Sequence, residues 1–170
     1  KELAYLHPNV FKPDISVLKD IGLTKDDPYV ILRFVSWNAH HDIGERGIQN
    51  KYEIVNRLGK FGHVFISSES PLSGRLKEYK LNISPEKIHD ALYYANLLFC
   101  DSQTMATEAG ILGTPVIRCN SFVGDDDMGN FIELEKKYNL IYNFNDEKKA
   151  IDFAESLLRV PNIKQEWVQR

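Results

Sequence analysis

A short segment near the middle of the chain carries residue types that can hold a phosphate. An apolar run, LLFC, leads directly into Asp101 and Ser102, and a helical pattern begins at Gln103. The first backbone N–H groups of a helix have no partner within it, and the helix dipole favours negative charge there. The hydroxyls of Ser102 and Thr104 add donors at the same place. The segment therefore predicts a phosphate site, and Asp101 or Ser102 can also serve as the helix cap.

Glu108 follows in the same expected helix, about one and a half turns from its start. A carboxylate at this spacing can accept two hydrogen bonds from a ribose diol, which is a common way of holding a nucleotide. The alternative is a solvated carboxylate on the helix surface. The small neighbours Ala106, Ala109 and Gly110 indicate that this helix packs closely, which weakens that alternative.

Strand-like and helix-like segments alternate around this site. Apolar runs of the kind found in buried parallel strands are expected to form strands at 29–35, 63–67, 97–100, 115–118 and 140–144. Apolar residues at helical spacing lie between them: Ile48, Tyr52, Val55 and Leu58; Ile88, Ala91, Leu92 and Ala95 after a Ser84 cap; 103–112; 131–138; and Ala150 to Leu158 after an Asn145 cap. This alternation implies right-handed crossovers. The expected fold class is α/β: a Rossmann-like open parallel sheet with helices on both faces, in three α/β/α layers.

The loops that follow the expected strands should carry the function, because ligands bind beyond the carboxyl ends of the strands in such a sheet. Residues 1–27 are interpreted as an interdomain linker and packing segment, and residues 28–170 as the domain. The loops concerned are 36–47, 67–74, 101–104 and 119–130. All four are expected to open onto one edge of the sheet.

Two of these loops contain further polar candidates. The first loop offers Asn38, His40 and Arg46, and a proton-transfer reaction could use His40, although an isolated His is more often a surface residue. The last loop contains three consecutive aspartates at 125–127. Adjacent carboxylates on an extended loop diverge, whereas they favour the N-terminus of a following helix. Helix entry is therefore the preferred interpretation over a metal site.

Composition restricts the function classes. A formal net charge of -3, with mixed signs along the chain, gives no general attraction for nucleic acid or an anionic membrane. No apolar run approaches the roughly 18 residues of a membrane span. Cys100 and Cys119 lie in apolar surroundings and are interpreted as buried thiols, so a reducing cytoplasm is the expected location. The chain begins without an initiator Met, which suggests a piece of a longer protein.

The segment DSQTMATEAGILGTPVI resembles part of the C-terminal half of GT-B enzymes, including UDP-N-acetylglucosamine 2-epimerases and the N-acetylglucosaminyl transferase of peptidoglycan synthesis. Those families show a pattern close to D-S-G-G-x-x-x-E-A-x-x-L-G-x-P-V. The resemblance implies that Ser102, Gln103 and Thr104 face a diphosphate and that Glu108 holds the ribose. Gln103 and Thr104 replace the paired glycines of the pattern, which leaves the identity of the donor open.

The resemblance extends from about residue 81 to residue 143, and more loosely from residue 29. It implies that the backbone near Ile83 contacts the base. It also implies that the residues nearest the sugar are Gly124, Asp125, Asp126 and Asn130. GT-B enzymes usually bind the donor without a metal, so neither a metal nor another cofactor is expected.

The sequence thus predicts the donor-binding half of a glycosyltransferase, with a nucleotide-sugar, and first a UDP-sugar, as its ligand. Its other partner would be the N-terminal GT-B half, without which the chain should bind and not turn over. One alternative is half of a nucleotide-sugar 2-epimerase, in which His40, Asp42 or Glu45 would handle a proton. Another is a non-catalytic module that binds a nucleotide or a protein.

Overall fold

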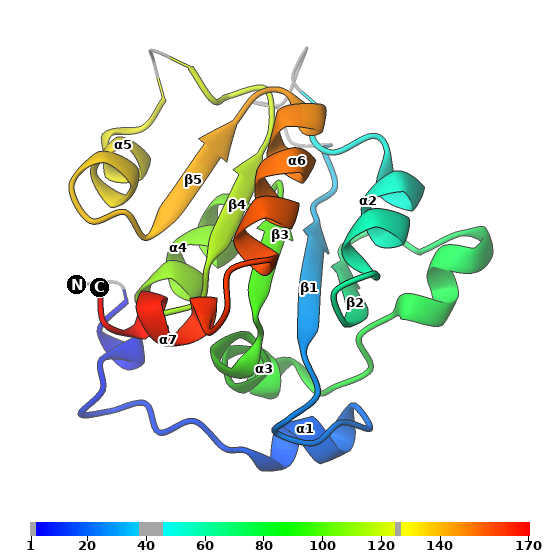
Figure 1. The fold of residues 1–170 in the computed structure, drawn as a ribbon, viewed down its shortest axis with the longest axis vertical. Coiled ribbons are helices and arrows are strands. Elements are labelled where there is room, and N and C mark those ends of the chain that lie inside the picture. The colour runs from blue at the N-terminus through cyan, green and yellow to red at the C-terminus, as the bar shows by residue number, and fades with distance from the viewer. Residues whose placement is uncertain (1–2, 38–45, 125–126) are drawn as a thin grey trace.

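The computed structural model describes residues 3–37, 46–124 and 127–170, and within them five parallel strands form one sheet. The strand order is β2-β1-β3-β4-β5, so the chain turns from one side of β1 to the other after β2 (Figure 1). The strands are β1 (Tyr29–Phe34), β2 (His63–Ser68), β3 (Leu97–Cys100), β4 (Val116–Cys119) and β5 (Ile141–Phe144). The Rossmann-like α/β fold expected from the sequence is confirmed.

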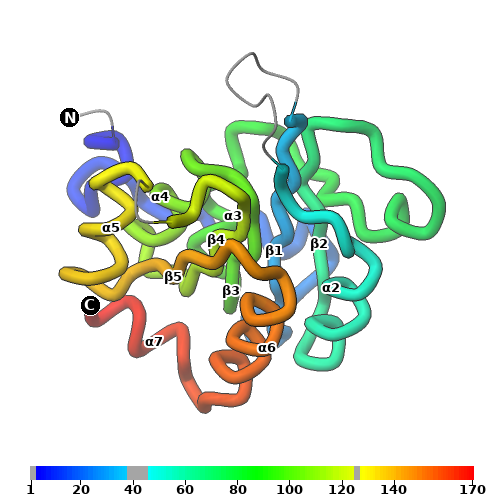
Figure 2. The backbone as a smooth tube through the Cα atoms, turned by 90° about the horizontal axis from the view of Figure 1, so that it is seen from above, coloured from blue at the N-terminus to red at the C-terminus, as the bar shows by residue number. Residues whose placement is uncertain are grey.

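Helices cover both faces of the sheet, as the view from above shows (Figure 2). One face carries α2 (Lys51–Leu58) and α6 (Glu147–Leu158), and the other carries α3 (Ile88–Tyr94), α4 (Gln103–Ile111) and α5 (Gly129–Lys136). Two short helices lie toward the amino edge of the sheet: α1 (Ser16–Asp20) and α7 (Ile163–Val168). Short 3-10 segments span Ala4–Leu6, Gly74–Tyr79 and Pro85–Lys87.

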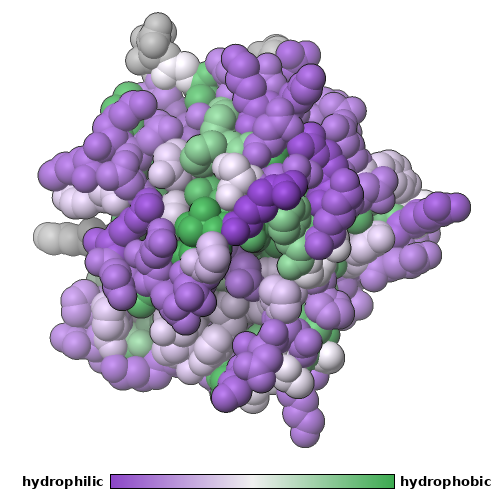
Figure 3. Space-filling view, in the orientation of Figure 1, coloured by the Kyte–Doolittle hydropathy of each residue, from purple (hydrophilic) through white to green (hydrophobic). Residues whose placement is uncertain are grey.

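The near-continuous apolar strands bury side chains on both faces, which is why they lack polar alternation. Ile31 and Leu98 pack on the α3 and α4 side, whereas Val30 and Phe99 pack on the α2 and α6 side, and all four are at most 1% exposed. The outer surface over α6 and α7 is mostly hydrophilic, with hydrophobic residues gathered near its centre (Figure 3). The core is thus two apolar layers separated by the sheet.

Three local expectations are wrong. The cap of α6 is Asp146, whose Oδ1 accepts from Lys149 N at 3.0 Å, while Asn145 donates its side chain to Val123 O. Ser84 stands before the first turn with Pro85 at its start, as expected, but its side chain makes no cap hydrogen bond, and that turn is the 3-10 segment that leads into α3. Tyr52 is 50% exposed because α2 begins at Lys51 and turns Ile54, Val55 and Leu58 toward the sheet.

Residues 3–27 pack on the α3 and α4 side of the domain and reach the amino edge of the sheet at α1 (Figure 1). Leu6, Val17 and Leu18 are buried in the same cluster as Ala91 and Leu92 of α3. This segment therefore contributes to the core. Both cysteines are buried and unpaired, as expected for thiols. Within the part of the chain that the structure describes, every helix is too short or too polar to cross a bilayer.

Candidate functional site

Asp101, the first residue after β3, binds the neighbouring loops together. Its Oδ1 accepts from Val35 N at 2.9 Å, and its Oδ2 accepts from Trp37 Nε1 at 3.1 Å and Ile48 N at 3.2 Å. Gly47 approaches the carboxylate so closely that any side chain there would collide with it. Burial raises the pKa of Asp101 above its ordinary value, although the three N–H donors oppose that shift. The side chain of Asp101 therefore holds the neighbouring loops in place.

The loops beyond the carboxyl ends of the strands meet at this edge, as the topology predicted. Asn120 Nδ2 donates to Asp101 O at 3.2 Å, which joins the loops after β3 and β4. The indole of Trp37 stacks on Phe122, with 5.6 Å between the ring centroids. On the far side, Glu69 after β2 accepts from Ser36 N at 2.9 Å. These contacts therefore connect the loops that follow β1, β2, β3 and β4.

The N-terminus of α4 has the cap that the sequence predicted. Ser102 Oγ accepts from Met105 N at 3.3 Å, and the backbone of Ser102 is extended. Because the cap satisfies one N–H group, those of Gln103 and Thr104 remain available to a ligand. Thr104 is exposed and Gln103 is half-buried. The helix can therefore offer both amides and side-chain donors to an anion.

A cavity of 230 Å³ lies beside this helix start. It is lined by Gln103, Thr104 and Thr107 of α4, by Met128, Asn130 and Phe131 at the start of α5, and by Leu3. The first residue of α5 follows Met128, whose side chain makes no cap hydrogen bond. The cavity thus brings two helix N-termini together, and it unites Gln103 and Thr104 with the expected sugar-proximal Asn130.

Glu108 is not solvated, because it is 8% exposed and has partners from two other segments. The hydroxyl of Tyr5 donates to Glu108 Oε1 at 2.6 Å, and His89 Nε2 lies 3.3 Å from the same oxygen. The hydrogen bond to Glu108 is the main reason that the pKa of Tyr5 rises to about 12. A phenolic hydroxyl therefore already occupies one oxygen of the carboxylate that the sequence assigned to the ribose.

The last aspartate of the run at 125–127 has a structural partner. Arg118 of β4 is fully buried, and its guanidinium donates to both oxygens of Asp127, at 2.7 and 3.2 Å. Asp127 also accepts from Met128 N at 2.9 Å, directly before α5. This agrees with helix entry as the role of Asp127. Asp125 and Asp126 lie outside the described residues, and Gly124 is exposed and absent from the lining of the 230 Å³ cavity.

A second cavity at the same edge has a volume of 660 Å³, and Arg46 is one of the residues that line it. The backbone N of Arg46 donates to Ser121 Oγ at 2.7 Å. Glu147, at the start of α6, accepts from the backbone N of Asn50 at 3.1 Å and also accepts from Gln49 N. A side-chain carboxylate of this chain thus occupies the N-terminus of α2, which composition and spacing did not indicate.

The remaining sequence candidates are not gathered at the cavity. Asn38, His40 and Asp42 lie outside the described residues. Ile83 is partly buried against the core on the α3 side, and it does not line the 230 Å³ cavity. Tyr5 and His89 were missed, because nothing in their local sequence indicates a contact with Glu108. Within the described residues, no group of three or more His, Cys, Asp or Glu side chains is arranged to hold a metal.

No family model matches this sequence, and no curated protein resembles it closely enough to count as a relative. A likeness exists among solved structures. The fold is similar to that of a histidine-to-alanine variant of the wall teichoic acid polymerase TagF, with a TM-score of 0.50 and 14% identity. The alignment covers 89% of this chain and 39% of the polymerase chain. At this identity the likeness shows the fold alone.

Proposed function

We propose that this chain binds a nucleotide-sugar, with a UDP-sugar as the first candidate, and is the donor-binding part of a glycosyltransferase. The observation that carries the proposal is the cavity between α4 and α5, where Gln103, Thr104 and Asn130 lie together. Both helices direct their positive ends toward it, and such ends favour a diphosphate. The same amides would stabilise the charge that develops on a departing diphosphate.

The fold of the similar solved structure supports the same proposed function. That protein is a polymerase of wall teichoic acid, and this chain corresponds to 39% of its length. The resemblance of the α4 segment to GT-B enzymes is independent of that comparison, because it comes from the sequence pattern alone. A second domain would then supply the acceptor site and the general base.

Calorimetric titration of the chain with UDP tests this function, and we expect weak binding that needs no metal. The cavity is smaller than ordinary ligand pockets of about 300–1,000 Å³, so part of the nucleotide stays in water. Excess EDTA should leave the affinity nearly unchanged, because helix amides already supply the positive potential. A loss of more than about tenfold, or roughly 1.4 kcal/mol, would contradict the metal-free mode. If no nucleotide or nucleotide-sugar gives a binding signal, the result would favour the alternative of a non-catalytic module.

Tyr5→Phe should tighten UDP binding, because it removes the hydroxyl that competes with ribose for Glu108. A hydrogen bond to a charged acceptor contributes roughly 1.5 to 3 kcal/mol, and Tyr5 is 44% exposed, so a gain of about threefold is expected. Tyr52→Phe is the matched control, since Tyr52 is similarly exposed on the other face of the sheet. Equal affinities in all three proteins would mean that Tyr5 and the ribose do not share the carboxylate.

A further inference from the structure

A cavity of 720 Å³ opens at the amino edge of the sheet, opposite the edge described above. Its walls come from the start of β1, the end of α3, the end of α6 and α7. Apolar side chains form much of them, including Leu18, Phe61, Leu158 and Val160. The volume is that of an ordinary small-molecule pocket, and none of the residues proposed for nucleotide binding lines it. The cavity is therefore a candidate site for a different ligand.

Asn96, in the wall of this cavity, carries amide donors without a partner. The residue is half-buried between α3 and β3, and its Oδ1 accepts from the backbone N of Tyr29 at 2.9 Å. Because the oxygen must be the atom that meets this N–H group, the orientation of the amide is determined, and Nδ2 carries the donors. No described residue accepts a hydrogen bond from Nδ2. These donors are therefore available to a ligand.

Lys164 of α7 adds a second nitrogen donor to the same wall. It is half-buried, and its Nζ donates to Oγ1 of the fully buried Thr114 and lies 5.3 Å from the centroid of the Tyr93 ring. An ammonium group has three N–H donors, so Thr114 does not use all of them. Within the described part of the chain, no carboxylate lies within ion-pairing distance of this amine. Burial disfavours the charged amine and lowers the pKa of Lys164 to about 7, an effect that a bound anion would oppose.

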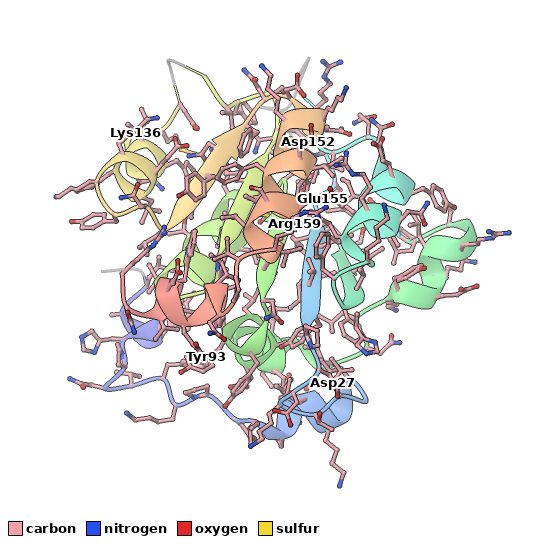
Figure 4. The ribbon with its side chains drawn as sticks, viewed as in Figure 1. Asp27, Tyr93, Lys136, Asp152, Glu155 and Arg159 are labelled. Carbon is pink, nitrogen blue, oxygen red and sulfur yellow. The ribbon has the colours of Figure 1, made fainter. Side chains whose placement is uncertain are left out.

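The charged side chains of the wall balance one another. They are Lys25, Asp26, Asp27 and Lys164. Lys25 and Asp26 are exposed neighbours, and the carboxylate of Asp27 accepts from the backbone N and the hydroxyl of Thr24, at 2.8 and 2.7 Å. Asp27 and Tyr93 lie toward the same end of the molecule (Figure 4). Because two cations face two anions, the total charge of the wall does not select the ligand, and the unpaired donors do.

Two half-buried donors beside an apolar wall restrict the chemistry of the ligand. Asn96 and Lys164 require an acceptor, and a carboxylate offers two oxygens with about four lone-pair sites. An ammonium head group has only donors and would leave both residues unpaired. Hydrogen bonds to a charged acceptor are roughly twice as strong as those between neutral groups, so a carboxylate gains more from these donors than an alcohol does. A chain of methylene groups matches the rest of the wall, because its burial is favourable.

We propose that this cavity binds a small amphiphilic monocarboxylate. The carboxylate accepts from Asn96 Nδ2 and Lys164 Nζ, and the alkyl chain packs against the apolar wall. Thr114 and the backbone N of Tyr29 hold the two donor side chains in position before the ligand arrives. The binding is noncovalent, and the site shares no residue with the nucleotide site proposed at the opposite edge.

Titration of the unmodified chain with hexanoate tests the site, and hexan-1-ol and hexylamine test the head group. Amide chemical shifts in nuclear magnetic resonance spectra report the affinity and the location. At pH 6.5 the Lys164 amine is mostly charged even with its lowered pKa. We expect saturable shifts at Asn96 and along α7, binding of hexan-1-ol that is at least about tenfold weaker, and no binding of hexylamine. Butanoate should bind at least about threefold more weakly than hexanoate, because it buries two fewer methylene groups.

Two variants separate the head-group contacts from the cavity itself. Lys164→Met removes the amine and keeps an apolar side chain, whereas Asn96→Asp keeps the acceptor for Tyr29 N and replaces the donor with a carboxylate oxygen. Each should weaken hexanoate binding by at least about tenfold and leave hexan-1-ol binding unchanged, which checks that the cavity is intact.

Lys136→Met is the matched control, since Lys136 is 75% exposed on α5 and lies far from Tyr93 (Figure 4). It should bind hexanoate as the unmodified chain does. The proposal is overturned if hexanoate causes no saturable shifts at Asn96 and α7, or if hexan-1-ol binds as tightly as hexanoate. It is also overturned if Lys164→Met or Asn96→Asp binds hexanoate as tightly as the unmodified chain.

Discussion

Glu108→Gln should lower the affinity for UDP by at least about tenfold while leaving the fold intact. The ribose diol donates two hydrogen bonds to the carboxylate in the proposed complex, and each bond to a charged acceptor contributes roughly 1.5 to 3 kcal/mol. Glutamine has the same shape, so the packing of α4 against α3 is preserved. Calorimetry with UDP measures the affinity, and circular dichroism checks the fold.

The 2′-deoxy nucleotide supplies the control for this substitution. The unmodified chain should bind deoxy-UDP less tightly than UDP, because one hydroxyl is lost. Glu108→Gln should bind the two nucleotides almost equally, since both changes remove the same interaction and the effects do not add. If the variant still discriminates ribose from deoxyribose as strongly as the unmodified chain, Glu108 has no part in binding and only anchors Tyr5.

Arg118→Met should destabilise the domain by about 3 to 5 kcal/mol, the cost of leaving one member of a buried ion pair alone. The Arg118 side chain is 0% exposed and that of Asp127 is 5% exposed, so water cannot replace the lost partner. The guanidinium also covers the ring of Phe131, 3.9 Å from its centroid. Urea unfolding followed by circular dichroism gives the free energy.

Two further variants test whether loss of the buried ion pair causes this destabilisation. Asp127→Asn combined with Arg118→Met should recover much of the loss, because no uncompensated charge then remains. Glu133→Gln breaks an exposed pair between α5 and Lys137, the residue that follows the helix, and should cost less than about 1 kcal/mol. Equal costs for Arg118→Met and Glu133→Gln would contradict the assigned role of the buried pair.

The fold could be predicted because its signals are local. Each strand is an apolar run, and each helix between them shows its own spacing, so the order of elements and the shared carboxyl edge followed directly. Ser102 as the cap of α4 was also a local signal. Cap positions such as Asp146 in place of Asn145 were harder, because either side chain can cap and only the course of the chain decides.

The contacts of the site were not predictable, because they join distant segments. Asp101 meets Val35, Trp37 and Ile48, which are 53 to 66 positions away in the sequence. Tyr5 is 103 positions from Glu108. The residue types suggested which side chains could bind a ligand. The protein groups that contact those side chains depend on how the loops and the N-terminal segment pack, which the local sequence does not show. The sequence pattern therefore located the helix N-terminus but not the tyrosine at its carboxylate.

The most direct test of the account is the position of UDP on the domain, measured by amide chemical shifts in a nuclear magnetic resonance titration. We expect the largest shifts at Gln103 to Met105, at the start of α4. Asn130 at the start of α5 should also shift, and Tyr5 should respond as its hydroxyl is displaced. Residues of the opposite edge, such as Lys164, should remain unchanged. Saturable shifts confined to regions away from α4 and α5 would contradict the account.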